Sequence, residues 1–169
     1  MFLGVGFETT APGTAAAVLE AARLELPNFS VLSMLKRVEP ALRALLALDG
    51  FDVQGFLCPG HVATILGEDG FRFLPEEYGV PGVIAGFSAG EIADALVRLL
   101  GHIAGGTPAL ENAYPRGVAP GGNPLARAAI DRVFVPAAGC WRGLGEIPDS
   151  ALALRPDYAA FDAQARFGL

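Results

Sequence analysis

Short apolar runs alternate with segments of helical periodicity along most of this chain. Five of the runs predict strands, at residues 2–7, 29–35, 51–57, 82–87 and 133–140. Strands that alternate with helices form mostly parallel sheets, because each crossover helix carries the chain back to the same end of the sheet. The sequence therefore predicts an α/β fold with three layers, in which helices cover both faces of a mostly parallel, doubly wound, Rossmann-like sheet of about five strands.

Helical patterns and turn residues fill the segments between these runs. Helices are expected at residues 15–24, 40–48, 92–100, 124–132 and 156–163. Residues 109–114 are expected to form one or two helical turns. An irregular stretch is expected at 68–80 and a turn-rich one at 141–148, because glycine and proline interrupt both.

A chain of 169 residues is long enough for one domain with a real core and short for two. We therefore expect residues 1–169 to form a single α/β domain. A core strand is predicted almost at Met1, which leads us to expect a fragment of a larger multidomain protein. Charged residues make up only 18% of the chain, so part of the surface is expected to be covered by another protein part.

The charge pattern excludes some classes of partner. The formal net charge is −6, and Lys36 is the single lysine. Binding to nucleic acid is not expected, because neutralising phosphates requires clustered lysine and arginine. No apolar run reaches the roughly 18 residues of a membrane-spanning helix. Cys58 and Cys140, without a signal peptide, fit a reducing compartment, so we expect two free thiols and a cytoplasmic location.

Polar side chains follow two of the predicted strands. Glu8, Thr9 and Thr10 come directly after the first strand, where a carboxylate and two hydroxyls can orient a small polar ligand. His61 follows the third strand in a Pro-Gly-His turn that leads into a helix, and its imidazole can exchange a proton near neutral pH. Open α/β sheets bind ligands at the carboxyl ends of their strands. We therefore expect these four residues to share one rim of the sheet and to line a cleft as candidate catalytic residues.

Cys58 lies three residues before His61, beside the same predicted helix start, and has two interpretations. It can be a small buried hydrophobic residue. It can also be a thiolate, activated by the helix N-terminus and His61 in a stand-alone α/β enzyme or small-ligand-binding domain. As a metal ligand it is only a weak candidate, because two residues do not complete a site. A third possibility is a protein-interaction module without chemistry of its own.

Four groups of residues, in the same order and over nearly the whole chain, resemble one family. They are Gly6-Phe7-Glu8-Thr9-Thr10-x-Pro12, then Pro59-Gly60-His61-Val62, then Asn112-x-Tyr114-x-Arg116 followed by Gly122-Asn123, and finally Trp141-Arg142-Gly143-Leu144-Gly145-x-Ile147-Pro148 followed by Phe161-Asp162-Ala163. Each motif alone is weak, but the joint pattern resembles HypD, the family of hydrogenase formation and maturation proteins.

The resemblance implies a cytoplasmic scaffold on which the Fe(CN)2CO centre of [NiFe] hydrogenase is assembled. It implies two partners, a HypC-type chaperone and a HypE-type cyanide donor. For the full-length family it also implies a [4Fe-4S] cluster and α/β domains around a cleft. Glu8, Thr9, Thr10 and His61 match motif residues that line or approach that cleft.

The chain departs from the family pattern in several places. The N-terminal cysteine motifs and the C-terminal cysteines that hold the cluster are absent from it. Leu35 stands where a histidine is expected, and Ser88 and Gly121 stand where glutamates are expected. We therefore expect a divergent, central α/β portion of a HypD-like protein, with no cofactor and no catalytic activity of its own.

Overall fold

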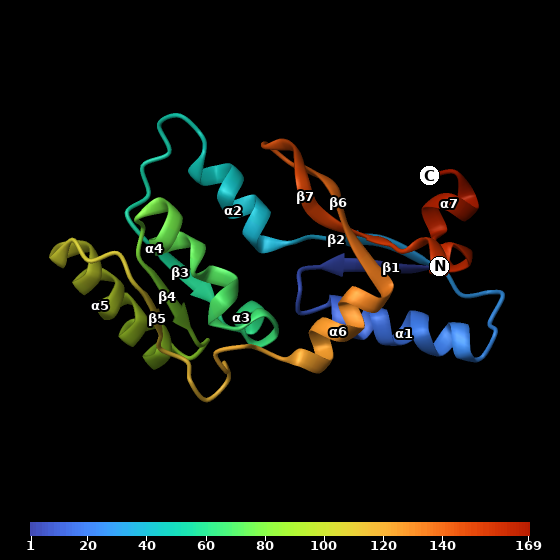
Figure 1. Cartoon of the computed structure of the whole chain (residues 1–169), viewed down its shortest axis with the longest axis horizontal. Coiled ribbons are helices and arrows are strands. Elements are labelled where there is room, and N and C mark those ends of the chain that lie inside the picture. Colours follow the sequence, from blue (N-terminus) through green and yellow to red (C-terminus); the bar gives the residue numbers. More distant parts are fainter. The chain divides into compact units, whose positions relative to one another are not determined.

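The computed structural model describes all 169 residues, and its contacts divide the chain into two compact units (Figure 1). Unit 1 comprises Met1–Ala44 and Leu125–Leu169, and unit 2 comprises Leu45–Pro124. Such a division is compatible with one domain or with two, so the expected single domain stays a prediction. None of the helices combines the length and the apolar character that crossing a lipid bilayer requires.

Unit 1 is built on two parallel strands, β1 (Phe2–Gly6) and β2 (Val31–Leu35), which are joined by α1 (Ala11–Arg23). One face of α1 is buried because small and apolar residues recur on it at helical spacing. These residues pack with β2 in a core made of Ala11, Ala15, Val18, Val31, Leu35, Val133, Phe134, Leu152 and Leu154.

The remaining elements of unit 1 come from both ends of its sequence. α2 (Val38–Leu46) follows β2 and spans the division between the units. α6 (Pro124–Val133) leads into an antiparallel hairpin of β6 (Phe134–Trp141) and β7 (Gly145–Leu154). The 3-10 helix η2 (Pro156–Phe161) and α7 (Ala163–Phe167) complete the chain.

Unit 2 contains a parallel sheet in the order β3 (Phe56–Pro59), β4 (Gly82–Ala85) and β5 (Leu110–Asn112). Between β3 and β4 the chain forms α3 (Gly60–Leu66), the 3-10 helix η1 (Glu68–Phe71) and α4 (Phe73–Tyr78). α5 (Ala89–Gly105) connects β4 to β5. Ala95 and Leu99 of α5 are buried against Val83 and Ala85 of β4.

The predicted α/β class is confirmed, because both parallel sheets are built from strands joined by helices. The strands belong to three separate sheets, however, and not to one sheet of about five strands. β6 and β7 explain part of the difference. A short turn joins them without a crossover helix, so they pair antiparallel with each other.

Several predicted elements differ from the structure. Residues 109–114 contain β5 and no helical turn, because Leu110–Asn112 pairs with β4. The stretch 68–80 forms η1 and α4, and β7 starts inside the segment expected to be turn-rich. The third predicted strand is much shorter than 51–57, since β3 is Phe56–Pro59.

Candidate functional site

Glu8 lies just beyond the end of β1 and is only 4% exposed. Its Oε1 accepts a hydrogen bond of 2.8 Å from the backbone N–H of Val38. Val38 is the first residue of α2, so the carboxyl satisfies one of the N–H groups that a helix N-terminus leaves unpaired. The other oxygen, Oε2, is buried and has no hydrogen-bond partner. A buried polar atom without a partner is rare in folded proteins, which makes Glu8 a candidate functional group.

Burial raises the pKa of the Glu8 carboxyl above its ordinary value of 4.5. The hydrogen bond from Val38 and the positive charge of Arg37 act in the opposite direction, but burial is the largest effect. Glu8 therefore keeps its proton to a higher pH than an exposed glutamate does.

The two threonines after Glu8 lie directly before α1. Thr10 is the N-cap residue of this helix, but its hydroxyl makes no capping hydrogen bond. Its backbone oxygen accepts from the backbone N–H and the hydroxyl of Thr14. A Cβ on Gly6, which has a φ of +148°, would lie 2.3 Å from the Thr10 hydroxyl oxygen. The close approach of Thr10 thus requires glycine at the end of β1, which explains the Gly-Phe-Glu-Thr-Thr order.

Aromatic and cationic side chains of unit 1 lie near Trp141. The Phe7 ring is 6.2 Å from the Trp141 ring, and Lys36 Nζ lies 5.8 Å from the centre of the same indole. Lys36 Nζ also donates to the Cys140 backbone oxygen at 3.1 Å. These contacts hold the end of β6 against the residues that follow β1 and β2. Trp141, the first residue of the fourth motif, thus has a structural role in unit 1.

Glu8→Ala is expected to lower the free energy of unfolding by about 1–3 kcal/mol, because the Val38 N–H loses its acceptor. Glu8→Gln keeps an acceptor and should cost less. Thr9→Ala is the control, since Thr9 is exposed and its loss should change stability by less than about 0.5 kcal/mol. Urea denaturation of the three variants measures these differences.

The same variants test the raised pKa of Glu8. As pH rises, the unfolded chain loses this proton before the folded protein does. The wild type should therefore lose stability relative to Glu8→Gln as pH rises from the ordinary glutamate range through the raised pKa, with no further change above it. A difference that is constant with pH, or that grows in favour of the wild type, would contradict this assignment.

His61 is exposed near the start of α3, at the carboxyl end of β3. Its ring stacks on Phe87, with 3.9 Å between the ring centres and 29° between the planes. A Cβ on Gly60 would lie 2.3 Å from the Ala85 backbone oxygen, so glycine is needed where α3 begins against the end of β4. The Pro-Gly-His turn thus places the imidazole beside an aromatic ring at the edge of the unit 2 sheet.

Cys58 is buried, and its side chain is 2% exposed. Burial raises the pKa of its thiol from 9.0 to about 12. Its sulfur lies 4.0 Å from the Phe56 backbone oxygen. Of the two interpretations of Cys58, the structure supports the small buried residue, and it argues against a thiolate activated by His61.

The structure corrects the expected shared rim. β1 belongs to the sheet of unit 1, whereas β3 pairs with β4 in the sheet of unit 2. We call Glu8, Thr9 and Thr10 the Glu8 corner, and His61 with its Pro-Gly-His turn the His61 corner. The two corners therefore do not lie on the rim of one sheet. The combination of Glu8, Thr9, Thr10 and His61 stays a proposal, and each corner is described within its own unit.

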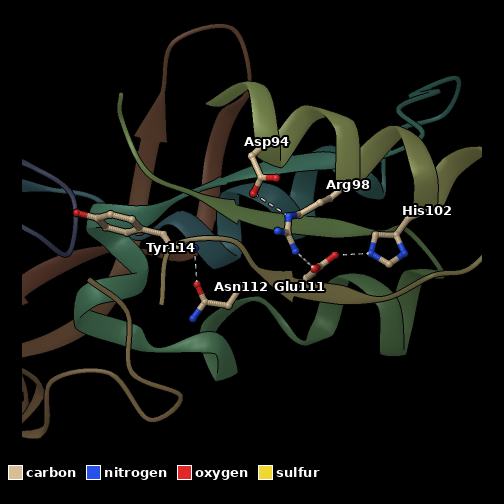
Figure 2. Close-up of polar contacts among 6 residues, drawn as sticks. All are labelled: Asp94, Arg98, His102, Glu111, Asn112 and Tyr114. Carbon is tan, nitrogen blue, oxygen red and sulfur yellow. Dashed lines mark hydrogen bonds and ion pairs between the residues drawn. The ribbon is translucent and has the colours of Figure 1, made fainter. Parts of the chain in front are cut away.

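Charged residues of α5 and β5 form a network that the sequence analysis missed (Figure 2). Arg98 donates to Asp94 at 2.8 Å and forms an ion pair with Glu111. His102 lies 3.1 Å from Glu111 through Nε2 and 3.3 Å from Thr107 through Nδ1. The Arg98 hydrogen bond is the main cause that lowers the pKa of Glu111. These charged side chains pair with one another and link the edge strand β5 to α5. Part of the network could have been predicted from the sequence, because Asp94 and Arg98 are four residues apart on one helix.

Asn112 organises the loop after β5. Its Nδ2 donates to Glu68 Oε1 and to the Val118 backbone oxygen, both at 3.1 Å. Its Oδ1 accepts from the backbone N–H of Tyr114 at 2.9 Å, as Figure 2 shows. Asn112 of the third motif thus stabilises the loop that follows β5 by hydrogen bonds.

Two of the departures from the family pattern have structural roles. Ser88 caps α5 through a capping box, in which its Oγ accepts from the Glu91 N–H and Glu91 Oε2 accepts from the Ser88 N–H. The Ser-x-x-Glu spacing could have revealed this box. Glu91 also forms an ion pair with Arg116. Leu35 is fully buried in the unit 1 core, so packing occupies the position where a histidine was expected.

The two cysteines of this chain do not supply the ligands of a [4Fe-4S] cluster. No group of three or more histidine, cysteine, aspartate and glutamate side chains could hold a metal ion. A [4Fe-4S] cluster takes four ligands, usually thiolates. The two cysteines, buried Cys58 and exposed Cys140, lie in different units.

Comparisons with known proteins agree with the motifs. The family model HypD, described as "Hydrogenase formation hypA family", matches residues 1–169. A hydrogenase maturation factor HypD from Azotobacter vinelandii is 40% identical over 175 residues, which cover 100% of this chain and 46% of the relative. The Rhodobacter capsulatus protein of the same name is 42% identical over 170 residues, covering 100% of this chain and 45% of the relative.

A third relative, hydrogenase maturation factor HypD from Escherichia coli K12, is 38% identical over 168 residues, which cover 99% of this chain and 45% of the relative. The chain thus spans about half the length of these relatives. The family model covers every residue, and the four motifs keep their order within it. The chain therefore belongs to the HypD family of hydrogenase formation proteins.

Proposed function

We propose that this chain is the scaffold portion of a cytoplasmic HypD-type maturation factor, which takes part in assembling the Fe(CN)2CO centre of [NiFe] hydrogenase. The family match over residues 1–169 carries the proposal. The names of the relatives, which call them hydrogenase maturation factors, support it.

The proposed partners are a HypC-type chaperone and a HypE-type cyanide donor. A scaffold works by holding partners and cargo in place, so it needs surface that is free to bind them. The low charged fraction of 18% supports such a role, because it leaves more uncharged surface than a small isolated domain needs.

The Glu8 corner is the proposed binding site of unit 1. A protonated Glu8 can donate a hydrogen bond from its unpartnered oxygen, and the hydroxyls of Thr9 and Thr10 can donate or accept. The cyanide nitrogens of an iron cargo accept hydrogen bonds, which these groups match in chemistry. His61 is the proposed proton-exchanging group of unit 2.

The [4Fe-4S] cluster expected for the full-length family is proposed to be held by residues outside this chain, because Cys58 and Cys140 do not fit it. We also propose that this portion has no catalytic activity by itself. The alternative of a Cys58–His61 enzyme is not retained, because burial keeps the Cys58 thiol protonated.

A chimera tests the proposed function. In the Escherichia coli relative, the 168 matched residues are replaced by this chain, and hydrogenase activity is measured in a strain that lacks the native relative. The chimera is expected to restore activity. Glu8→Ala and His61→Ala should each lower it by about tenfold or more, the size that loss of a positioned acid–base or binding group commonly gives.

Leu125→Ala is the matched control, because Leu125 is 83% exposed and lies outside both corners. The abundance of each chimera is measured by immunoblot, so that loss of fold is separated from loss of function. Failure of a stably expressed chimera to restore activity would overturn the maturation role. Full activity of the Glu8 and His61 variants would overturn the assignment of the two corners.

A further inference from the structure

β1 carries the open edge of the unit 1 sheet. It pairs with β2 from Phe2↔Val31 to Gly6↔Leu35 and with no other strand. β2 is also in contact with β7, and Lys36, directly after β2, forms a bridge with Ala151 of β7. Hydrogen bonds from the Phe2 N–H and to the Gly6 oxygen point toward β2. Because peptide groups alternate in direction along a strand, those of Leu3 and Val5 lie on the open edge.

Apolar side chains near this edge are exposed. Leu3, Val5 and Met34 are 55%, 60% and 50% exposed. The register pairs Val5 with Met34 and Leu3 with Leu32, so these four side chains share one face of the sheet. On the other face, a Cβ on Gly4 would lie 3.5 Å from the Thr14 side chain of α1. One face of this parallel sheet is thus covered and the other is not, although parallel sheets are normally buried on both faces.

The edge of β1 also lacks the residues that normally prevent an exposed edge strand from pairing with another strand. Natural edge strands carry prolines or charged side chains, which block pairing with another strand. β3 ends in Pro59, β5 carries the ion-paired Glu111, and β6 contains Pro136. β1 consists of Phe-Leu-Gly-Val-Gly and has neither proline nor charge.

We infer that the open edge of β1 pairs with a further strand, which is supplied by the part of a HypD-type protein that this chain does not cover. The relatives are more than twice as long as the matched segment, since it covers 46% of the Azotobacter vinelandii protein. The surface to be covered has no charge, so the added segment presents apolar side chains to Leu3, Val5 and Met34. The inference rests on family membership and not on the maturation role.

Hydrogen exchange tests this inference. A chimera is made in which this chain replaces the 175 matched residues of the Azotobacter vinelandii relative. Exchange of the Leu3 and Val5 amides, measured by mass spectrometry with fragmentation, is compared between the chimera and the isolated 169-residue chain. Pairing should slow both amides by at least about tenfold in the chimera, because exchange then requires the edge to open.

Two lysine variants of the chimera complete the test. Val5→Lys should restore fast exchange of the Leu3 amide, because a lysine on a strand edge opposes pairing. Val97→Lys, at a 70% exposed position on α5, should leave the protection unchanged. Equal exchange in the chimera and the isolated chain would overturn the inference. Protection that appears in the isolated chain and grows with its concentration would also overturn it, because a second copy would then be the partner. The readout does not depend on hydrogenase activity, so the inference and the proposed function fail separately.

Discussion

Gly122→Ala is expected to destabilise unit 2 by about 2–5 kcal/mol, the combined size of a strained backbone and a local steric overlap. Gly122 has a φ of +68°, which alanine adopts only with strain. A Cβ at this position would lie 2.3 Å from the Ile65 backbone oxygen and 2.5 Å from the Gly67 nitrogen. Backbone atoms cannot move aside as a flexible side chain can. The loop after β5 crosses the end of α3 at this point, held there by the hydrogen bond from Asn123 N–H to the Ile65 oxygen.

Gly101→Ala is the matched control. Gly101 lies within α5 of the same unit, and apart from its own helix backbone and chain neighbours a Cβ there would meet no atom within 4 Å. Alanine is the better helix former, so this variant should gain about 0.5–1 kcal/mol. Urea denaturation followed by circular dichroism measures both variants. Equal stability of Gly122→Ala and the wild type would mean that the crossing of the loop and α3 is looser than described.

Cys58 is expected to resist thiol reagents in the folded protein. A pKa raised from 9.0 to about 12 means about a thousandfold less thiolate at neutral pH, because each pKa unit is a factor of ten. The thiolate is the reactive form, and burial blocks the approach of the reagent as well. Cys140 is exposed, so the reagent can reach it, and one thiol should be titrated in the native protein and two after unfolding.

The variant Cys140→Ser makes the measurement unambiguous. It should show no fast-reacting thiol when folded and one when denatured, with Ellman's reagent as the probe. A Cys58 that reacts at an ordinary rate in the folded Cys140→Ser variant would return the Cys58–His61 enzyme to consideration.

The elements with strong local signals could be predicted from the sequence. α6 starts at Pro124, directly after Asn123, as the Asn-Pro pair indicates. α5 ends next to Gly106, which adopts the left-handed conformation expected of a glycine that stops a helix. β1, β2 and β4 lie within the predicted apolar runs.

The partition of the strands into sheets could not be predicted, because pairing joins residues far apart in sequence. The assignment of β7 as a strand could not be predicted for the same reason. Gly145, Pro148 and Asp149 are turn formers, yet this segment belongs to a strand that pairs with β6. Pro148 and Asp149 lie at an irregularity in that pairing, where Asp149 adopts a φ of 55°. β5 has three residues, which are too few to show a period.

The candidate site was predictable only in part. The position of Glu8 directly after an apolar run indicates a polar group at the carboxyl end of a strand, and the structure places it there. Its hydrogen bond to Val38 spans 30 residues, so neither the capping of α2 nor the raised pKa could be foreseen. The expected common rim with His61 depended on a single sheet and was wrong for that reason.

The environment of Trp141 has a practical consequence for studies of this protein. It is the one tryptophan of the chain, its indole N–H donates to Ser150 Oγ at 2.7 Å, and both residues belong to unit 1. Indole fluorescence therefore reports the unfolding of unit 1 alone, whereas far-ultraviolet dichroism reports both units. Superimposing the two melting curves distinguishes concerted from stepwise unfolding with no added dye or label.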